Sequence, residues 1–273
     1  MFTKLQQGDV NVENFDVIGV NYDCSRRADI RIVGKFAELL QIEMTDRCLE
    51  VGSGTGNYTL SLSEMGYKMT GVDPSSTMAN VAIKKDTNRQ VTWVKGCAEC
   101  LPFHDNVFSG VFCMHVVHHF DKRLVAFKEI FRVMNKGRFV IFTNSHEQIN
   151  NYWLKHYFPK VIQKTINRTP DTSVIKSLLQ SAGFKVIKVE KYHIPDDLED
   201  GFLGSNKVNP HRYIDHCFRT GISAFWDMSD REIASGVKRL EEDVSTGKVH
   251  EIIKNYENNL GEYLFVVCEK KLL

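Results

Sequence analysis

Two kinds of segment alternate along the first half of the chain: short, mostly apolar runs and longer segments in which apolar and polar residues are mixed. Short runs rich in β-branched and aromatic residues occupy positions 47–51, 68–72, 91–95, 107–114 and 138–143. Segments of helix length separate these runs, so the pattern predicts strands that alternate with helices. Such alternation requires right-handed crossover connections, which build a mostly parallel sheet covered by helices on both faces.

One of the intervening helices is predicted within residues 124–137. Val125, Ile130 and Val133 fall near one face of this helix, which we expect to pack on the sheet. Gly137 stands where a C-terminal stop is expected, because glycine readily adopts the left-handed conformation that ends many helices.

The regular alternation of predicted strands and helices ends after the fifth run. A helix that ends at Gly183 is predicted, followed by a strand at 184–194 and a last strand at 262–270. The long interval between these strands contains two predicted helices, 209–226 and 230–248. Because no internal repeat or low-complexity linker interrupts the chain, we expect one domain with an appended helical cap.

The composition narrows the classes of function. With 42% hydrophobic and 25% charged residues, the 273-residue chain is ordinary for a globular protein with a substantial core. Its 35 basic and 34 acidic residues give a formal charge of +1, so no overall field attracts nucleic acid or an anionic membrane. No signal-peptide segment or long apolar run is present, so we expect a cytoplasmic protein.

The seven cysteines are scattered, and their number is odd. Cys97 and Cys100 have CxxC spacing, but no second pair or nearby histidine completes a zinc pattern. Cys48, Cys113 and Cys268 fall within predicted strands, where a small apolar side chain suits a core. The pattern favours reduced, mostly buried thiols over a metal or redox site, and we expect no bound metal.

Three glycines follow the first predicted strand and open the next helix: Gly52, Gly54 and Gly56. In an open α/β sheet, ligands bind beyond the carboxyl ends of the strands, where the strand order reverses. Glycine at this place allows a tight turn and lets backbone amides approach a ligand without a Cβ in the way. Alone, a GxGxG pattern is a weak signal, because it also marks turns that only pack a helix.

Two carboxylates near the glycines limit the kinds of ligand that the loop can bind. Asp73 ends the second strand, 17 residues after Gly56, where a carboxylate can accept both hydroxyls of a ribose. Glu50 precedes Gly52 by two residues and would repel phosphate while suiting a cationic, amino-acid-like group. The spacing also differs from the GxGxxG of dinucleotide sites. A ligand with a ribose and little phosphate describes S-adenosylmethionine, a sulfonium with an α-amino acid tail.

Three segments together resemble a known family. CLEVGSGTGNYTLSL, GVDPSSTMANVA and GCAECLPFHDNVFSGVFCMHVVHHF occur in the order and spacing of the class I S-adenosylmethionine-dependent methyltransferases. Within that family they resemble the broad group that includes the ubiquinone- and menaquinone-pathway enzymes. The resemblance covers about residues 21–143 and the final strands. It implies a Rossmann-like α/β fold with a mostly parallel seven-stranded sheet, helices on both faces and a helical cap inserted between the last two strands.

The resemblance also implies how the single domain, residues 1–273, is divided. The expected parts are an N-terminal cofactor-covering segment (1–45), a cofactor-binding core (46–144), a helical substrate cap (145–183 and 195–260) and the final strands (184–194 and 262–270).

Roles for individual residues follow from the resemblance alone. Residues of the glycine loop would hold the methionyl part, Asp73 would take the ribose hydroxyls, and Met78 would pack on the adenine. The segment NYDCSRRADI resembles an N-terminal Tyr-x-x-x-Arg segment that closes over the cofactor carboxylate. The complete implied set for the cofactor S-adenosyl-L-methionine, and for its product S-adenosyl-L-homocysteine, is Tyr22, Arg26, Glu50, Gly52, Ser53, Gly54, Gly56, Asp73, Pro74, Met78, Ala98, Glu99 and His115.

The sequence departs from the family pattern at three places. Cys97 stands where the family usually has an aspartate that contacts the adenine amine, and Ser109 replaces a common aspartate in the fourth strand. NKGRF is shorter than the usual Pro-Gly-Gly turn before the fifth strand. None of these changes affects the glycine loop or Asp73.

Methyl transfer from a sulfonium needs a base only when the acceptor atom arrives protonated. His118 and His119 follow the fourth strand, near the expected position of the methyl group, and are our candidates for a base or a substrate-orienting group. The alternative is that both histidines cap or pack under the following helix.

Aromatic residues after the fifth strand and between the last two strands are the candidates for an apolar substrate pocket. They are Tyr152, Trp153, Tyr157, Phe218, Phe225 and Trp226. The alternative is that they only hold the cap on the sheet. Arg212 and Arg219 are candidates for contact with an anionic group, or else surface charges.

The sequence therefore predicts a methyltransferase that transfers a methyl group to a small-molecule acceptor by in-line displacement, without nucleic-acid or membrane partners. The alternatives are an RNA or protein methyltransferase and a non-catalytic sensor of S-adenosylmethionine. A nicotinamide-dependent oxidoreductase is disfavoured by the glycine spacing. The acceptor atom, whether oxygen, nitrogen, sulfur or carbon, and the oligomeric state are left open.

Overall fold

The computed structural model describes residues 22–226 and 228–270. Its centre is one seven-stranded sheet with the order β3-β2-β1-β4-β5-β7-β6. Every predicted strand is present, and the observed bounds are β1 Arg47–Val51, β2 Lys68–Asp73, β3 Thr92–Lys95, β4 Phe108–Met114, β5 Met134–Thr143, β6 Lys185–Tyr192 and β7 Tyr263–Lys270. Six strands run in one direction and only β7 runs in the other, so the sheet is mostly parallel as predicted.

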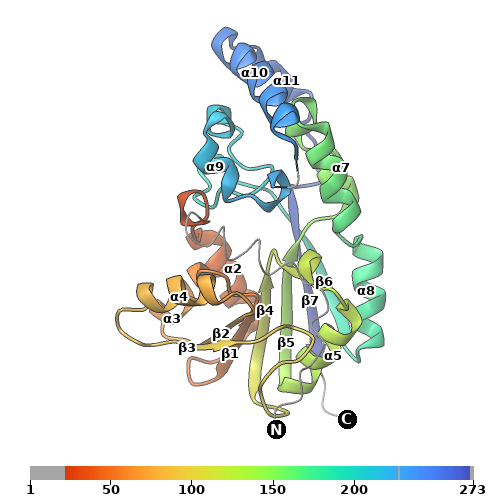
Figure 1. Ribbon diagram of the computed structural model, residues 1–273. Coiled ribbons are helices and arrows are strands. Elements are labelled where there is room, and N and C mark those ends of the chain that lie inside the picture. The colour runs from red at the N-terminus through yellow and green to blue at the C-terminus, as the bar shows by residue number, and fades with distance from the viewer. Residues whose placement is uncertain (1–21, 227, 271–273) are drawn as a thin grey trace.

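Helices cover both faces of this sheet (Figure 1). One face carries α2 (Ile30–Leu40), α3 (Asn57–Glu64) and α4 (Ser76–Lys85), and the other carries α5 (Arg123–Val133) and α8 (Thr172–Ser181). The buried side chains accordingly form two hydrophobic clusters. The α/β class and the Rossmann-like arrangement expected from the sequence are confirmed.

Helix α2 was not predicted from the sequence, yet it is strongly amphipathic. Asp29 caps its N-terminus by accepting a hydrogen bond from the amide of Arg31 at 2.9 Å. Phe36 points from the buried face into the sheet, with its ring centroid 4.6 Å from that of Phe112 and 5.4 Å from that of Phe265. These contacts fix the segment that leads into the helix against the sheet.

The prediction that Gly137 ends a helix is wrong. Helix α5 ends at Val133, where Lys270 of β7 donates to the carbonyls of Phe131 and Met134 at 2.6 Å each. Gly137 lies inside β5 at φ +143°, at a register shift between β4 and β5. A Cβ there would lie 1.9 Å from the carbonyl oxygen of Ser109, so only glycine fits.

The buried face of α5 also differs from the expected one. Ile130 and Val133 are fully buried as predicted, but Val125 is 41% exposed. Ala126 and Phe127 take its place against the sheet, because they lie four and three residues before Ile130 on the same face.

Helices beyond the sheet form a cap above the carboxyl ends of the strands (Figure 1). Between β5 and α8 lie α6 (His146–Asn150), η3 (Trp153–His156) and α7 (Pro159–Arg168). Between β6 and β7 lie η4 (Pro210–Ile214), α9 (His216–Thr220), η5 (Ser223–Phe225), α10 (Asp230–Thr246) and α11 (Lys248–Lys254). The predicted insertion of a helical cap between the last two strands is confirmed.

The single helix predicted over 209–226 is instead three short helical pieces. Asp215 ends η4 and begins α9, where its carboxylate accepts the amide of Cys217 at 2.9 Å. Gly221 then ends α9. The predicted helix at 230–248 corresponds to α10, which starts at a capping box of Ser229 and Glu232 and ends before Gly247.

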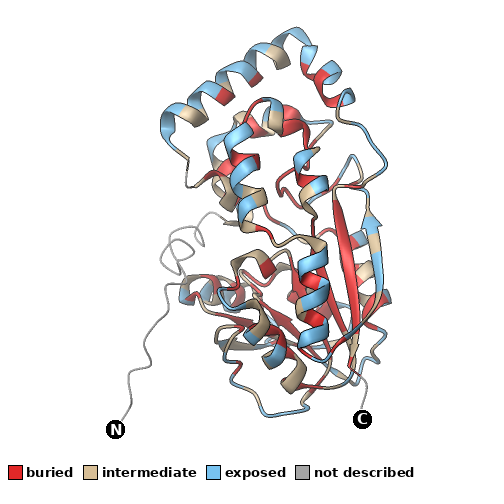
Figure 2. Cartoon of the chain, turned by 90° about the vertical axis from the view of Figure 1, so that its right-hand side faces the viewer, coloured by how far each residue is buried: buried red, intermediate tan, exposed pale blue. Residues whose placement is uncertain are grey.

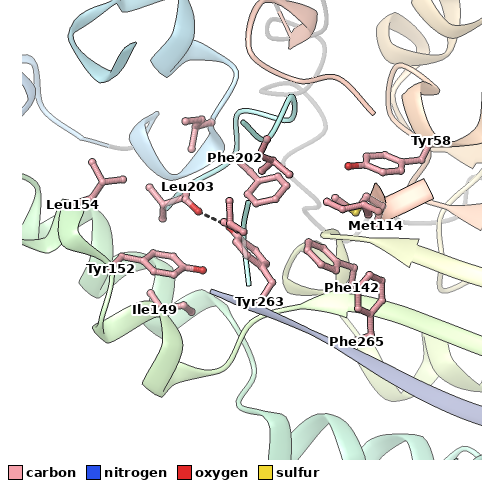
Figure 3. Packing of buried hydrophobic residues seen from close by; sticks show 14 of the residues in the cluster. Tyr58, Met114, Phe142, Ile149, Tyr152, Leu154, Phe202, Leu203, Tyr263 and Phe265 are labelled. Carbon is pink, nitrogen blue, oxygen red and sulfur yellow. Dashed lines mark hydrogen bonds between the residues drawn. The ribbon is translucent and has the colours of Figure 1, made fainter. Parts of the chain in front are cut away.

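The cap and the sheet share one apolar core, and the strands in it are buried along most of their length (Figure 2). Figure 3 shows Tyr263 of β7 beside Phe142 and beneath the loop that carries Phe202 and Leu203. The Tyr263 ring stacks on Phe142 at a centroid distance of 5.0 Å, and its hydroxyl donates to the Leu203 carbonyl at 2.5 Å. This packing holds the loop after β6 over the end of the sheet.

The described chain begins at η1 (Tyr22–Cys24), so residues 1–21 of the predicted N-terminal segment lie outside the described residues. Among the helices of residues 22–226 and 228–270, none is long and apolar enough to cross a membrane.

Candidate active site at the carboxyl ends of the strands

The strand order reverses between β1 and β4, which are neighbours in the sheet although two strands separate them in the chain. A hollow opens at this point, and about 920 Å³ of space lies within it and its solvent-open entrance together. We call it the first cavity, and its wall is formed by Tyr22, Arg26, Val51, Gly52, Gly54, Asp73, Pro74, Met78, Gly96, Cys97, Ala98, Glu99, Met114, His115, Val116, His118, His119, Phe120, Gly221 and Ser223. The wall thus includes most of the predicted cofactor residues and both predicted catalytic histidines.

Glycine at position 52 is required by the geometry of the loop after β1. Its amide donates to the Val72 carbonyl at 2.8 Å, which holds the loop against β2. Its φ is +77°, and a Cβ would lie 2.5 Å from Cγ2 of Val116. Any side chain there would both strain the backbone and collide with the wall of the first cavity.

Asp73 is buried at the end of β2 and faces the first cavity. Its Oδ2 accepts the amide of Gly54 at 2.8 Å, and its Oδ1 accepts the amide of Ser75 at 2.9 Å. These two hydrogen bonds orient the carboxylate, which is the type of group that accepts the hydroxyls of a ribose. The carboxylate thereby joins the glycine loop to the loop after β2.

Three of the predicted cofactor residues do not lie on the cavity wall: Glu50, Ser53 and Gly56. Glu50 is buried within β1, where the Thr59 hydroxyl of α3 donates to its carboxyl group. Burial raises the pKa of Glu50 to about 8, although the hydrogen bonds from Thr59 oppose the shift. Gly56 begins α3 instead of lining the hollow. These residues support the loop from beneath.

Tyr22 and Arg26, which were predicted to act together, lie side by side on the wall of the first cavity. Nη1 of Arg26 donates to the Tyr22 hydroxyl at 2.9 Å. Nε and Nη2 donate to the two carboxylate oxygens of Asp200 at 2.5 and 3.1 Å, and the Tyr58 hydroxyl donates to Asp200 at 3.0 Å. Although burial alone would lower it, the Asp200 charge raises the pKa of Arg26, so the guanidinium stays charged.

Three histidines form a connected group after β4. The ring centroids of His115 and His118 are 4.8 Å apart, and those of His118 and His119 are 4.0 Å apart. His115 has φ +50°, and its amide donates to the Phe142 carbonyl at 3.0 Å, which turns the chain sharply out of the strand. Nδ1 of His115 and Nδ1 of His118 are shielded from solvent and have no hydrogen-bond partner. Both atoms can therefore pair with a ligand.

The surroundings keep these imidazoles neutral. Burial lowers the pKa of His115 and of His118 well below the usual 6.5, and neighbouring positive groups add to the effect. Burial, followed by the charges of Arg168 and Arg123, lowers the pKa of His119 to about 3. A neutral imidazole with so low a pKa is a weak base but a competent hydrogen-bond partner.

A second cavity adjoins the first, and about 560 Å³ of space lies within it and its solvent-open entrance together. The two share Arg26, His115, His118 and Ser223. We call it the second cavity, and its other wall residues are Asn144, Lys164, Thr165, Arg168, Thr169, Phe202, Leu203, Ile222 and Ala224. It lies between α7, the loop after β6 and η5, under the cap.

The six aromatic residues predicted for the substrate pocket line neither of these two cavities. The structure instead buries five of them in the core that joins cap and sheet: Tyr152, Trp153, Tyr157, Phe218 and Phe225. The sixth, Trp226, is half-buried and donates to the Thr220 carbonyl at 2.7 Å. Their size and low exposure fit the packing role that was the alternative.

The two arginines considered for anion binding also serve the cap. Nη1 of Arg219 donates to the carbonyls of Tyr213 and Ile214 at 2.6 Å each. The Arg212 guanidinium lies 4.4 Å from the ring centroid of Phe218. Neither side chain lines the two cavities.

Sequence reasoning missed the polar residues of the second cavity and the partner of Arg26. Asp200 is 174 residues from Arg26 and carries no local signal that would connect them. Lys164 and Arg168 do carry one, because they are four residues apart in a helix and fall on one face with Thr165 and Thr169.

The first cavity fits a phosphate-poor adenosyl ligand. Arg26 is the only lysine or arginine among its wall residues in the described part of the chain, and Asp200 already pairs with it. Pro74, Met78 and Ala98 supply apolar surface beside the Asp73 carboxylate. In residues 22–226 and 228–270, no three His, Cys, Asp or Glu side chains are grouped so that they could hold a metal ion.

Comparison with known proteins agrees with this arrangement. A family model described as a methyltransferase domain matches residues 49–142. A demethylmenaquinone methyltransferase of Lactococcus lactis subsp. lactis (strain IL1403) is 27% identical over 184 residues, which cover 58% of this chain and 71% of that protein.

Two solved structures share the fold. A putative methyltransferase from an antibiotic biosynthesis pathway of Anabaena variabilis ATCC 29413 superposes with a TM-score of 0.81 at 29% identity, over 89% of this chain and 98% of that chain. Phosphoethanolamine N-methyltransferase 2 of Haemonchus contortus, in complex with S-adenosyl-L-methionine, has a TM-score of 0.60 at 19% identity, over 98% of this chain and 59% of that chain. The second likeness concerns the fold alone.

Proposed function

Since this chain belongs to the class I S-adenosylmethionine-dependent methyltransferases, we propose that it methylates a small-molecule acceptor enclosed between the sheet and the cap. The first cavity holds the cofactor and the second holds the acceptor. The observation that carries this proposal is the wall that the two cavities share, formed by Arg26, His115, His118 and Ser223. A donor and an acceptor on the two sides of this wall would face each other.

The glycine loop and Asp73 position the cofactor in this proposal. Asp73 accepts the ribose hydroxyls, while Gly52 and Gly54 leave room for the methionyl part beside their backbone. Arg26 and Tyr22 lie where they can meet the carboxylate of the cofactor. When bound, the cofactor supplies an electrophilic methyl group, whose bond to sulfur breaks with both electrons left on sulfur as the acceptor atom bonds to carbon.

His118, which lines both cavities, orients the acceptor in this proposal, and His119 lies beside it on the cofactor side; neither acts as a strong base. Burial lowers the pKa of both histidines, so each is neutral at pH 7 and accepts or donates a hydrogen bond. Holding the acceptor atom in line with the methyl group and excluding water supplies most of what such a displacement needs.

The position of the second cavity favours a small acceptor over RNA or protein. Its wall includes Leu203 and Ile222, which are only 4% and 5% exposed, so a segment of a macromolecule could reach them only if part of the cap moved aside. The Lactococcus relative is named for demethylmenaquinone, which is likewise a small-molecule acceptor.

Turnover tests the proposal. The purified protein is incubated with S-adenosylmethionine that carries a ¹³C-labelled methyl group and with a metabolite extract freed of macromolecules. We expect S-adenosylhomocysteine to form together with a labelled small molecule, and His118→Ala to slow both. Binding of the cofactor without turnover, or label found only in added RNA or protein, would contradict the proposal.

A further inference from the structure

One short segment, residues 22–26, lies between α9 of the cap and the helices α3 and α4, and Figure 1 shows it in red. We call it the cover segment. Its Tyr22 and Arg26 line the first cavity, and Gly52 and Gly54 of the glycine loop line the same cavity. A ligand in the first cavity is therefore held between the cover segment and the glycine loop, and it is freed from both only when they separate.

A polar cluster joins the cover segment to the glycine loop and to the helices that follow this loop. Oδ1 of Asp23 accepts the Thr55 hydroxyl at 2.6 Å and Nδ2 of Asn57 at 3.1 Å. Oδ2 of Asp23 accepts Nζ of Lys85 at 2.9 Å. Asn57 completes the cluster, because its Nδ2 also donates to the Arg26 carbonyl at 3.2 Å and its Oδ1 accepts Lys85 at 2.5 Å.

The partners of Asp23 come from three different elements. Thr55 lies in the glycine loop, Asn57 is the first residue of α3, and Lys85 is the last residue of α4. We call the four side chains of Asp23, Thr55, Asn57 and Lys85 the Asp23 cluster. One carboxylate thus connects the cover segment to all the parts of the chain that follow β1 and β2 at this edge of the sheet.

Different contacts join the cover segment to the cap. Arg26 donates two hydrogen bonds to the Asp200 carboxylate, and the Gly201 amide donates to the Ser25 carbonyl at 2.8 Å. Gly221 at the end of α9 lies so close that a Cβ there would be 1.8 Å from Oγ of Ser25. The cover segment is therefore attached to the cap by a buried ion pair and by close backbone packing.

The two sets of contacts differ in their access to water. The side chains of Lys85 and Asp23 are 29% and 35% exposed, so water can replace the contacts of their charged groups when they separate. Those of Arg26 and Asp200 are 10% and 1% exposed, and their separation would leave two buried charges without partners. The Asp23 cluster is therefore the set of contacts that separates at the lower cost in free energy.

We propose that Asp23 is a positioning residue that holds the cover segment closed over the cofactor. The Asp23 cluster separates when the cofactor enters or leaves, and the cover segment then stays attached to the cap. Asp23 does not itself line the first cavity, so it acts through Tyr22 and Arg26, which do. The inference rests on the proposed function in one respect, because it assigns the first cavity to the cofactor.

The rate at which S-adenosylhomocysteine dissociates tests the inference without requiring turnover. The protein is loaded with the radiolabelled compound, which is then chased with an excess of the unlabelled compound. We expect Asp23→Ala and Lys85→Met each to raise the dissociation rate constant about three- to tenfold, because the closed position loses contacts that stabilise it. The association rate constant and the number of sites per chain should stay as in the wild type, which damage to the site itself would not allow.

A double-mutant cycle shows whether Asp23 and Lys85 act together. Because each substitution separates the same ion pair, the double variant should dissociate little faster than either single variant. Lys35→Met is the matched control. Lys35 forms an ion pair of similar exposure with Glu190, at 21% and 27%, but lines neither of the two cavities, so its loss should not change the rate.

Hydrogen exchange shows on which side the cover segment opens. The Gly201 amide, whose hydrogen bond to Ser25 belongs to the side of the cap, should be as protected in ligand-free Asp23→Ala as in the ligand-free wild type. Measurement of this amide by nuclear magnetic resonance gives the comparison directly.

Unchanged dissociation in both single variants, a loss of affinity that comes wholly from slower association, effects that add in the double variant, or loss of protection at Gly201 would overturn the inference. Each of these results would leave the proposed function standing if the labelled methyl group still reaches a small molecule. Failure of the wild type to bind S-adenosylhomocysteine at all would instead contradict both.

Discussion

The Arg26 guanidinium and the Asp200 carboxylate form a bidentate ion pair, with Nε 2.5 Å from Oδ1 and Nη2 3.1 Å from Oδ2. Arg26 lines both cavities, and Asp200 lies on the loop that leads from β6 into the cap. The pair therefore joins the N-terminal part of the cofactor site to the cap. It also places a fixed cation at the wall where donor and acceptor would meet.

Asp200→Ala should strongly destabilise the protein. The side chain of Asp200 is 1% exposed and that of Arg26 is 10% exposed, so the substitution leaves a buried charge without its partner. We expect the free energy of unfolding to fall by about 3–5 kcal/mol, measured by urea titration. Asp197→Ala is the control: its side chain is 82% exposed, and loss of its ion pair with Arg31 should destabilise the protein far less, because water screens an exposed pair. Similar losses in both variants would show that the buried pair of Arg26 and Asp200 stabilises the fold no more than an exposed ion pair does.

Stability should fall as the pH drops below about 6.5, the usual pKa of histidine in an unfolded chain. In the folded protein the pKa values of His115 and His118 are lowered, and that of His119 is lowered to about 3, so only the unfolded chain takes up these protons. Each neutral histidine should remove about 1.4 kcal/mol of stability per pH unit over this range.

Urea titrations at pH 7, 6 and 5 measure that slope. His118→Gln and His119→Gln should each make this slope shallower. A slope that neither substitution changes would mean that these imidazoles accept protons in the folded state.

Gly52→Ala should weaken cofactor binding. The backbone at φ +77° disfavours any residue with a Cβ, and this Cβ would lie 2.5 Å from Cγ2 of Val116. We expect the affinity for S-adenosylhomocysteine to fall about tenfold or more, and Val116→Ala in the same chain to restore only part of it. Gly34→Ala is the control, because a Cβ there meets nothing within 4 Å and should stabilise α2 without changing the affinity. If Gly52→Ala bound S-adenosylhomocysteine as tightly as wild type, the assignment of the glycine loop to the cofactor site would be wrong.

Asp73→Asn should also weaken cofactor binding. We expect a loss of about 1.5–3 kcal/mol in the binding free energy of S-adenosylhomocysteine, because hydrogen bonds to a charged acceptor are lost. Asp86→Asn is a matched control: Asp86 is equally buried and accepts the amides of Gln90 and Val91, but it lines neither cavity. Equal affinities in wild type and Asp73→Asn, measured by calorimetry, would contradict the assignment of Asp73 to the ribose.

The fold could be predicted from the sequence because its strands are short apolar runs with a clear period. Two predictions of helices were wrong, because contacts in the folded protein, and not the local sequence pattern, determine the structure there. Gly137 has the appearance of a helix stop, but it lies in β5 because the carbonyl of Ser109 leaves no room for a side chain. The segment 209–226 has the apolar content of a helix, but local capping by Asp215 divides it.

The candidate site was predicted in part for a similar reason. Its cofactor half lies in contiguous motifs after β1, β2, β3 and β4, which a sequence displays directly. The second cavity, where we propose that the acceptor binds, is assembled from α7, η5 and the loop after β6, which are far apart in the chain, so only its residues on α7 share a local pattern. Large aromatic residues such as Trp153 were predicted to line a substrate pocket because of their apolar rings. In the structure Trp153 is buried in the core.

A crystal structure of the protein with S-adenosylhomocysteine would test the central claim most directly, namely that a donor and an acceptor meet at the wall shared by the two cavities. We expect the ribose at Asp73 and the thioether sulfur beside His115 and His118, with its open side facing the second cavity. A nucleoside bound elsewhere, or a sulfur atom that faces away from the second cavity, would contradict the account.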